Sequence, residues 1–254
     1  MTAPQPRLPA VYRLVRYDTV GSTNDEAKRL ARASAEEGTL VWGLEQTAGR
    51  GRRGRAWSSP PGNLYASLIL RPRCPLDQAA QLGFIAALAV GDTLSSICEN
   101  PLDRLSYKWP NDVLLRGRKI AGILLESETA APDAADFVVI GIGVNLVSAP
   151  RDVEFPATSF AEAGCVGVTP PRLLEAFARC FAGWAGRWRE EGFAPVRAAW
   201  LKRASGLGEG IRVRLERQTL DGRFLDLDHD GALLLDAAEG RRRIAAGEVF
   251  PAQG

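Results

Sequence analysis

A short segment rich in arginine and glycine is the feature that most constrains this chain. Residues 49–55 carry four arginines and three glycines in the order Gly-Arg-Gly-Arg-Arg-Gly-Arg. Such a segment is too charged and too flexible to belong to a buried core. Arginine offers planar donors for carboxylate and phosphate oxygens, and glycine lets backbone N–H groups approach the same oxygens. The segment therefore predicts a surface loop that handles an anionic ligand.

The sequence on either side predicts that this loop joins two strands. Residues 40–45 and 63–70 are rich in apolar and aromatic side chains, as strands are. A charged loop between two strands of a sheet is placed like the lid of a binding site. Taken alone, the segment leaves two alternatives open, a solvated surface loop and a nucleic-acid contact without sequence preference.

The composition is that of a globular protein with balanced charge. The chain has 254 residues, of which 46% are hydrophobic and 24% charged, and its formal net charge is +2. This length allows one large domain or two unequal ones, and the net charge does not point to nucleic acid. We find no run close to the roughly 18 apolar residues that cross a bilayer and no apolar core of a signal peptide, so we expect a cytoplasmic protein without membrane association.

The cysteines and the single histidine lack the spacing of a metal site. Cys74, Cys98, Cys165 and Cys180 are far apart in the sequence, and we interpret them as reduced, mostly buried apolar side chains. His229 lies in a turn-like sequence, which favours a structural role over a catalytic one.

Periodicity predicts a larger α+β domain followed by a small β domain. The apolar pattern indicates helices at residues 22–33, 75–98 and 170–191, and further strands at 11–17, 105–109, 113–115, 119–126 and 137–145. Thr23 has capping-box spacing to Glu26 and could cap the first helix. After Gly206 the pattern changes to short strands at 211–217, 223–228, 232–236 and 241–245. We therefore predict one domain over residues 1–205 and a small SH3-like β-barrel over residues 206–254.

Two further clusters could carry chemistry. Lys108 lies at a strand end in Tyr-Lys-Trp-Pro-Asn-Asp, where its ammonium could meet a carboxylate or phosphate, although a surface lysine before a turn fits equally well. Gly122, inside an apolar strand, marks either a bulge or the close approach of a ligand to the backbone. The segment Ile140-Gly-Ile-Gly-Val-Asn145 lacks the third glycine of a dinucleotide fingerprint, and the chain contains no P-loop.

In combination these motifs resemble the biotin protein ligase family, the biotin–[acetyl-CoA-carboxylase] ligases. The resemblance rests on the Arg-rich segment with Trp57, on Lys-Trp-Pro-Asn-Asp from Lys108, on Lys-Ile-Ala-Gly-Ile-Leu around Gly122, and on Gly-Ile-Gly-Val-Asn up to Asn145. It extends from Ser-Thr-Asn at residues 22–24 to Gly-Glu-Val at residues 247–249. One departure is Gly21, where many relatives carry a polar or acidic residue.

The resemblance implies a fold and a reaction. The fold is a mixed, largely antiparallel sheet packed by helices, similar to class II synthetases, with the SH3-like domain after it. The reaction has two steps: biotin and ATP, with Mg²⁺, give biotinyl-5′-AMP and pyrophosphate, and a lysine of the biotin carboxyl carrier protein, or of a carboxylase carrier domain, then takes the biotinyl group. Cations that neutralise the crowded negative charge would serve both steps.

The resemblance also implies roles for individual residues, while it names no metal ligands. Lys108 and Arg52 would be catalytic. Biotin would be bound by Ser22, Thr23, Asn24, Gln46, Arg50, Gly51, Arg52, Lys108 and Gly122. ATP and the adenylate would be bound by Arg52, Arg55, Trp57, Lys108 and Asn145.

Some family members also repress biotin operons through an N-terminal helix-turn-helix domain. Only about ten residues precede the first predicted strand, so we expect a ligase without repressor activity or nucleic-acid binding, which a gel shift with operator DNA would test.

Two alternatives to a biotin ligase remain: a lipoate ligase or octanoyltransferase of similar fold, and an RNA-binding protein, against which the dispersed and balanced charge argues. The sequence leaves a homodimer open.

Overall fold

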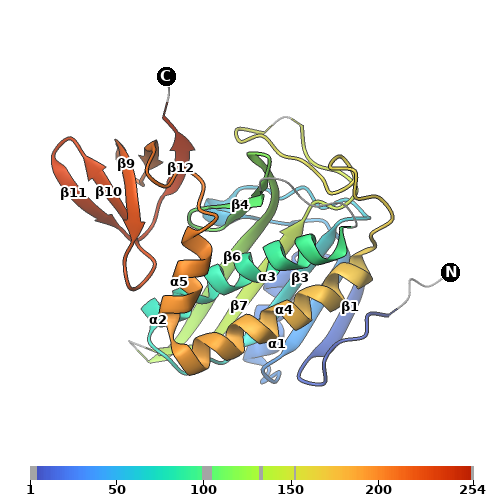
Figure 1. Ribbon diagram of the computed structural model, residues 1–254. Coiled ribbons are helices and arrows are strands. Elements are labelled where there is room, and N and C mark those ends of the chain that lie inside the picture. Colours follow the sequence, from blue (N-terminus) through green and yellow to red (C-terminus); the bar gives the residue numbers. More distant parts are fainter. Residues whose placement is uncertain (1–4, 99–104, 132–133, 152, 253–254) are drawn as a thin grey trace.

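A mixed sheet of seven strands forms the centre of the larger part of the molecule (Figure 1). The computed structural model describes residues 5–98, 105–131, 134–151 and 153–252. The strand order is β1-β2-β3-β7-β6-β5-β4, and only β1 and β2 run parallel. The strands are β1 (Arg13–Val20), β2 (Thr39–Gln46), β3 (Leu64–Leu70), β4 (Leu105–Lys108), β5 (Asp112–Leu115), β6 (Arg118–Ala131) and β7 (Ala134–Val144). The predicted mixed, largely antiparallel sheet is confirmed.

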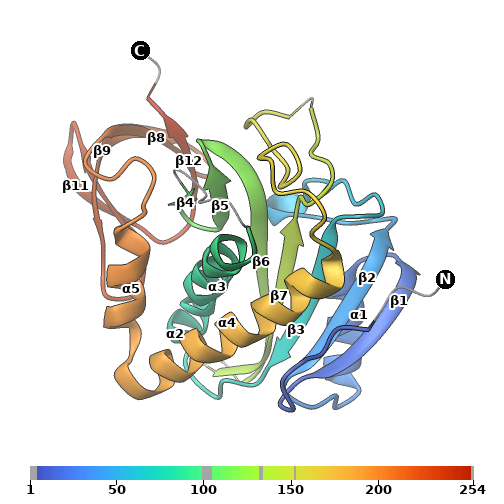
Figure 2. The same cartoon turned by 45° about the vertical axis from the view of Figure 1, so that its right-hand side comes forward.

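Helices cover both faces of this sheet, because its central strands are apolar on both faces. On β3, Ile69 packs toward α1 (Thr23–Arg32), whereas Leu68 belongs to the larger core on the opposite face. That opposite face is covered by α3 (Leu82–Ile97) and α4 (Pro170–Glu191), as Figures 1 and 2 show. The site therefore rests on a sheet held between two helical layers.

The helix predicted at residues 75–98 is broken near its start. A short helix, α2 (Leu76–Ala80), precedes α3, and Gln81 lies between them. By length and composition the stretch Leu76–Ile97 could cross a membrane, although it is no unbroken apolar run, because Asp77 and Asp92 interrupt it. Two thirds of an 18-residue part of it is buried, and α3 packs against the sheet and α4.

The first helix is capped by a different residue from the one predicted. Ser22 is the N-cap of α1, and its hydroxyl accepts a hydrogen bond from the Asp25 N–H at 3.4 Å. The capping role predicted for Thr23 is wrong, because Thr23 is already the first helical residue and its hydroxyl donates a hydrogen bond to the Gln46 side chain. The shift by one residue leaves Thr23 free to face the centre of the molecule.

A second, antiparallel sheet of five strands follows the helix α5 (Phe193–Leu201) and lies beside β4 in Figure 1. Its order is β11-β10-β9-β8-β12, which fits an SH3-like domain, and no pairing among the described residues closes it into a barrel. The strands are β8 (Gly210–Arg214), β9 (Thr219–Leu227), β10 (Leu233–Ala237), β11 (Gly240–Ile244) and β12 (Glu248–Pro251). The sequence pattern had not indicated α5 or β12.

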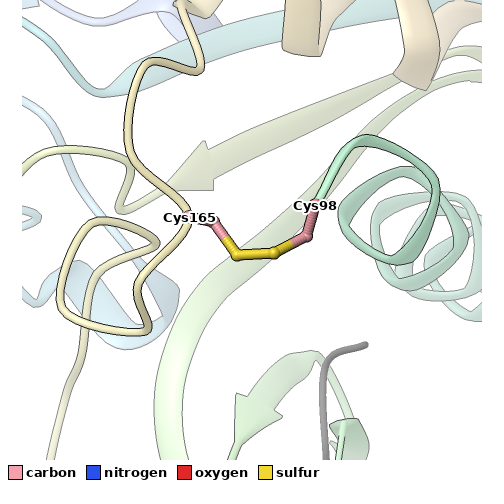
Figure 3. Close-up of a disulfide and its surroundings, with 2 residues drawn as sticks. All are labelled: Cys98 and Cys165. Carbon is pink, nitrogen blue, oxygen red and sulfur yellow. A yellow bond between two sulfur atoms is a disulfide. The ribbon is translucent and has the colours of Figure 1, made fainter. Parts of the chain in front are cut away.

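A disulfide joins Cys98, at the end of α3, to Cys165 in the loop between β7 and α4 (Figure 3). The interpretation of these two cysteines as reduced is therefore wrong, whereas Cys74 and Cys180 are free. The two bonded residues are 67 positions apart, and only the fold brings their Cα atoms to 5.5 Å. The bond ties the loop that leads into α4 to the helix packed on the sheet.

We predict that removal of this disulfide destabilises the fold. A bond that closes a loop of this length restricts the unfolded chain and typically contributes about 2–4 kcal/mol. The double variant Cys98→Ser/Cys165→Ser should lose that much free energy of unfolding in urea titrations without reductant. With dithiothreitol the difference from the wild type should vanish. Alkylation of all four cysteines in the unreduced, denatured wild type would contradict the bond itself.

Candidate functional site

One cavity of about 820 Å³ lies between the large sheet, the loop that follows β2, and strand β12. A cavity of this size can enclose most of a small organic ligand. Every site residue predicted from the sequence lines it: Ser22, Thr23, Asn24, Gln46, Arg50, Gly51, Arg52, Arg55, Trp57, Lys108, Gly122 and Asn145. The structure thus brings the predicted residues together, and their individual roles stay predictions.

The Arg-rich loop, residues 49–57, folds back on itself beside the cavity. The Gly51 N–H donates to the Arg55 carbonyl at 2.7 Å, and the Trp57 N–H donates to the Gly49 carbonyl at 2.9 Å. A single 3-10 turn, η1 (Arg52–Gly54), forms the tip, and its last two residues have φ of 55° and 72°. The turn sends the arginine side chains in different directions, so each meets different partners.

Arg50 points back toward the large sheet. Its guanidinium donates to both carboxylate oxygens of Glu126 at 3.0 Å and also pairs with Asp25. The Ser22 hydroxyl lies 3.5 Å from the same guanidinium. Arg50 is therefore held at the end of the cavity where α1 begins.

The other loop arginines contact the C-terminal sheet. Arg52 donates to the Gly247 carbonyl at 2.9 Å, and Arg55 donates to the Glu248 carboxylate at 2.8 Å, with Arg53 at 3.7 Å from the same group. Burial lowers the pKa of Arg52. Burial by itself would raise the pKa of Glu248, but the surrounding arginines outweigh this effect and lower the pKa of Glu248 below its usual value. Strand β12 therefore holds the loop in place over the cavity.

Neutral polar groups line the end of the cavity beside α1. The Thr23 N–H and hydroxyl both donate to Gln46 Oε1, at 2.8 and 3.0 Å, and Gln46 Nε2 donates to the Ser59 hydroxyl at 2.9 Å. Asn24 accepts from the Ser67 hydroxyl at 2.6 Å. Ser22, Thr23 and Asn24 are buried, so this network is fixed in position rather than exposed to water.

Two lysines share one buried carboxylate on the opposite side. Asp112 Oδ2 lies 2.9 Å from Lys108 Nζ, and Asp112 Oδ1 lies 2.6 Å from Lys119 Nζ. Burial raises the pKa of Asp112, but the two ammonium groups outweigh this and hold the pKa below its usual range. Lys108 also lies over the Phe155 ring at 4.0 Å. The carboxylate thus fixes two cations side by side on the cavity wall.

Asp112 and Lys119 are functional candidates that the sequence analysis did not single out, although both lie in the motifs that carried the resemblance. The signal available in the sequence was the acidic residue four positions after Lys108. Nothing local places Lys119 beside it, because the contact depends on β5 pairing with β6. Both residues line the cavity.

Paired glycines form a flat floor under the Trp57 ring. Gly122 on β6 is the register partner of Gly143 on β7. A Cβ at Gly143 would lie 2.6 Å from the indole of Trp57, and one at Gly122 would lie 3.1 Å from it. The group that closely approaches Gly122 is thus the Trp57 ring and not a ligand. A larger residue at Gly143 would displace Trp57.

Asn145 directly follows β7 and lines the cavity. Its side chain is buried and donates to the Thr158 carbonyl at 3.1 Å, while its backbone N–H donates to the Ile120 carbonyl at 2.9 Å. It therefore ties the end of β7 to the segment around Thr158, and residues 153–155 and 157 of that segment line the cavity.

We predict that Asp112→Asn lowers stability by about 3 kcal/mol at pH 7, because it leaves two ammonium groups without their shared anion. Because the folded-state pKa of Asp112 lies below its usual value, its contribution is present above about pH 4 and is lost as the pH falls through the folded-state pKa. Urea titrations from pH 7 to pH 3 should show the two proteins converging. The control Asp136→Asn breaks a more exposed pair with Arg71 and should change stability little. A constant difference at all pH values would contradict this account.

Two family models match the chain. The model of the biotin/lipoate A/B protein ligase family matches residues 17–145. The model of the biotin protein ligase C-terminal domain matches residues 206–250. The first match includes every predicted site residue, and the second includes strand β12, which holds the Arg-rich loop.

Curated relatives agree with these models over nearly the whole chain. A biotin–[acetyl-CoA-carboxylase] ligase from Paracoccus denitrificans is 46% identical over 235 residues, which are 90% of this chain and 96% of the relative. A bifunctional ligase/repressor BirA from Bacillus subtilis is 37% identical over 93% of this chain and 73% of its own length.

A solved structure shares the fold. Biotin protein ligase from Aquifex aeolicus in complex with biotin and ATP superimposes with a TM-score of 0.79 at 28% identity, covering 95% of this chain and 99% of the other. The similarity thus includes both sheets.

Proposed function

This chain belongs to the biotin protein ligase family, and from that premise we propose that it joins biotin to ATP and then transfers the biotinyl group to a lysine of a carrier protein. The observation that carries the proposal is the two-ended cavity. One end offers neutral hydrogen-bonding groups around Thr23 and Gln46, and the other offers several fixed cations, Lys108 and Lys119 among them. Biotin has a neutral, polar ureido ring and an anionic carboxylate, and ATP is strongly anionic.

The neutral end is proposed to bind the ureido ring of biotin. Ser22 and the hydrogen-bonded pair Thr23 and Gln46 line this end, where Ser22 and Thr23 are buried and Gln46 is partly exposed. Arg50 and the backbone of Gly51 lie beside them and would close over the ligand. Because this network is rigid before binding, it would recognise the ring at little entropic cost.

The cationic end is proposed to carry out adenylation. A carboxylate oxygen of biotin attacks the α-phosphorus of ATP, the bond to the β-phosphate oxygen breaks, and pyrophosphate leaves. Lys108, Lys119 and Arg52 would neutralise the repulsion between the two anions, and Asp112 would keep both lysines in place. Arg55, Trp57 and Asn145 are proposed to contact the nucleotide.

The second step needs no protein nucleophile. The neutral amine of the carrier lysine attacks the acyl carbon of biotinyl-5′-AMP, AMP leaves with the electron pair of the broken bond, and the new amide nitrogen loses a proton. The closed Arg-rich loop would retain the reactive anhydride until the carrier arrives. The name of the Paracoccus relative supports a carboxylase as the source of the carrier and ligase activity alone as the role.

Mg²⁺ is implied by the use of ATP, but the described carboxylates of the cavity do not form a metal site. Asp112, Glu154 and Glu248 are all ion-paired with lysine or arginine. We therefore derive no step through the metal, which ATP-dependent enzymes commonly hold through substrate phosphates.

We also propose a division of the chain near residue 205. The C-terminal family match begins at residue 206, and the two sheets do not share a strand. The smaller domain is proposed to serve the reaction through β12, whose Glu248 contacts the Arg-rich loop.

We predict that Lys108→Ala and Arg52→Ala each lower biotin-dependent ATP–pyrophosphate exchange by about a hundredfold, the usual effect of removing one fixed charge contact to a transition state. Circular dichroism should show intact folds. Arg118→Ala, a change to a half-exposed neighbour of Lys119, is the control and should exchange at close to the wild-type rate. Wild-type exchange in both site variants would contradict the assigned roles.

The main alternative is a lipoate ligase, because the first family model covers both activities. The biotin-specific C-terminal match and the named relatives favour biotin. In a transfer assay that offers biotin and lipoate together with ATP and apo carrier domains of both kinds, mass spectrometry should detect only the biotinyl product. A lipoyl product would overturn the choice of substrate.

A further inference from the structure

Glu126 lies on β6 just outside the cavity, yet it contacts two of the segments that line it. Its carboxylate accepts from Arg50 Nη2 at 3.0 Å through each oxygen and from Asn24 Nδ2 at 2.7 Å. Lys28 Nζ donates to it as well, at 3.1 Å. One side chain therefore joins the Arg-rich loop, the first helix and the large sheet.

Asn24 is fixed so that its amide group must face Glu126. Its Oδ1 atom accepts from the Ser67 hydroxyl at 2.6 Å, which leaves the Nδ2 donor for Glu126. Asn24 lies directly against the sheet at Gly141, where a Cβ would lie 2.2 Å from its Oδ1. Glu126 is therefore the closer of the two acceptors of this amide, since the Leu124 carbonyl lies 3.4 Å from the same nitrogen.

The charges around Glu126 balance. Arg50 and Lys28 supply two positive charges, and Glu126 and Asp25 supply two negative ones, with Lys28 Nζ 3.2 Å from Asp25 Oδ1. The side chain of Glu126 is 27% exposed and that of Asp25 is 55% exposed. Water screens the exposed pair with Asp25 more strongly than the pair with Glu126. Both oxygens of Glu126 accept from the same nitrogen of the Arg50 guanidinium, Nη2, whereas Nη1 contacts Asp25 and Ser22.

We propose that Glu126 is a positioning residue for the biotin end of the cavity, holding Arg50 and Asn24 where the ligand meets them. The identity of the ligand in this inference rests on the proposed function, whereas the effect of Glu126 on the loop rests on the structure alone. Without the carboxylate charge, Arg50 keeps only the exposed Asp25 as an anionic partner, and the Arg-rich loop opens more often.

The test compares Glu126→Gln with Glu128→Gln. Glu128 lies two residues further along the same strand, hence on the same face, and pairs with Arg32 at 3.0 Å away from the cavity. Each variant loses one carboxylate that binds an arginine of another segment. A general effect of removing charge from β6 would therefore appear equally in both.

We expect Glu126→Gln to raise the KM for biotin about tenfold, as for the loss of one charged hydrogen bond, while kcat and the KM for ATP change less than about threefold. Trypsin should cleave the ligand-free variant after the loop arginines several times faster than the wild type, because the loop opens more often. Glu128→Gln should resemble the wild type in all of these measurements. Should Glu126→Gln fail to fold, Glu126→Asp, with a retracted charge, should show smaller changes in the same directions.

An unchanged biotin KM together with unchanged trypsin cleavage would overturn the proposal, as would equal changes in Glu128→Gln. The two arms also separate this inference from the proposed function. The wild type could show no biotin-dependent reaction while trypsin still cleaves the loop of Glu126→Gln faster than that of the wild type. That result would support the positioning of Arg50 and reject biotin as the ligand.

Discussion

Positive charges that line one cavity repel one another unless anions lie among them, and this requirement explains much of the structure around the site. The two lysines share Asp112, Arg50 is paired through Glu126, and Arg55 is paired through Glu248. The cations are thus held in fixed positions before any ligand arrives. Fixed charges stabilise a developing anion more effectively than charges that must first reorganise.

The fold supplies these anions from segments that are far apart in the sequence. The antiparallel pairing of β5 with β6 places Asp112 near Lys119, and β12 of the C-terminal sheet brings Glu248 to the Arg-rich loop. In Figure 2 the C-terminal sheet stands next to the β4–β5 end of the large sheet, on the side where the cavity lies. The second sheet is therefore part of the site and not only an appendage to it.

Much of this could be predicted from the sequence, and most of the exceptions share a physical cause. The strong periodicity of α4 predicted its bounds, because that signal is local, whereas the expectation that the Arg-rich loop and Lys108 share one site came from the family resemblance. The bond between Cys98 and Cys165 and the partners of the arginines are contacts over long sequence separations, and no local pattern records them. The cap at Ser22 was missed for another reason, since neighbouring Ser and Thr offer nearly equal caps.

The central claim is that the two-ended cavity binds biotin beside ATP. Isothermal titration with biotin, in the presence and absence of a non-hydrolysable ATP analogue, tests it most directly. The account predicts one biotin bound per chain, and weaker binding in a variant whose neutral end is altered at Thr23 or Gln46. The titrations are run at two temperatures, because the binding enthalpy cannot be zero at both. The absence of binding heat at both temperatures, with and without the analogue, would contradict the claim.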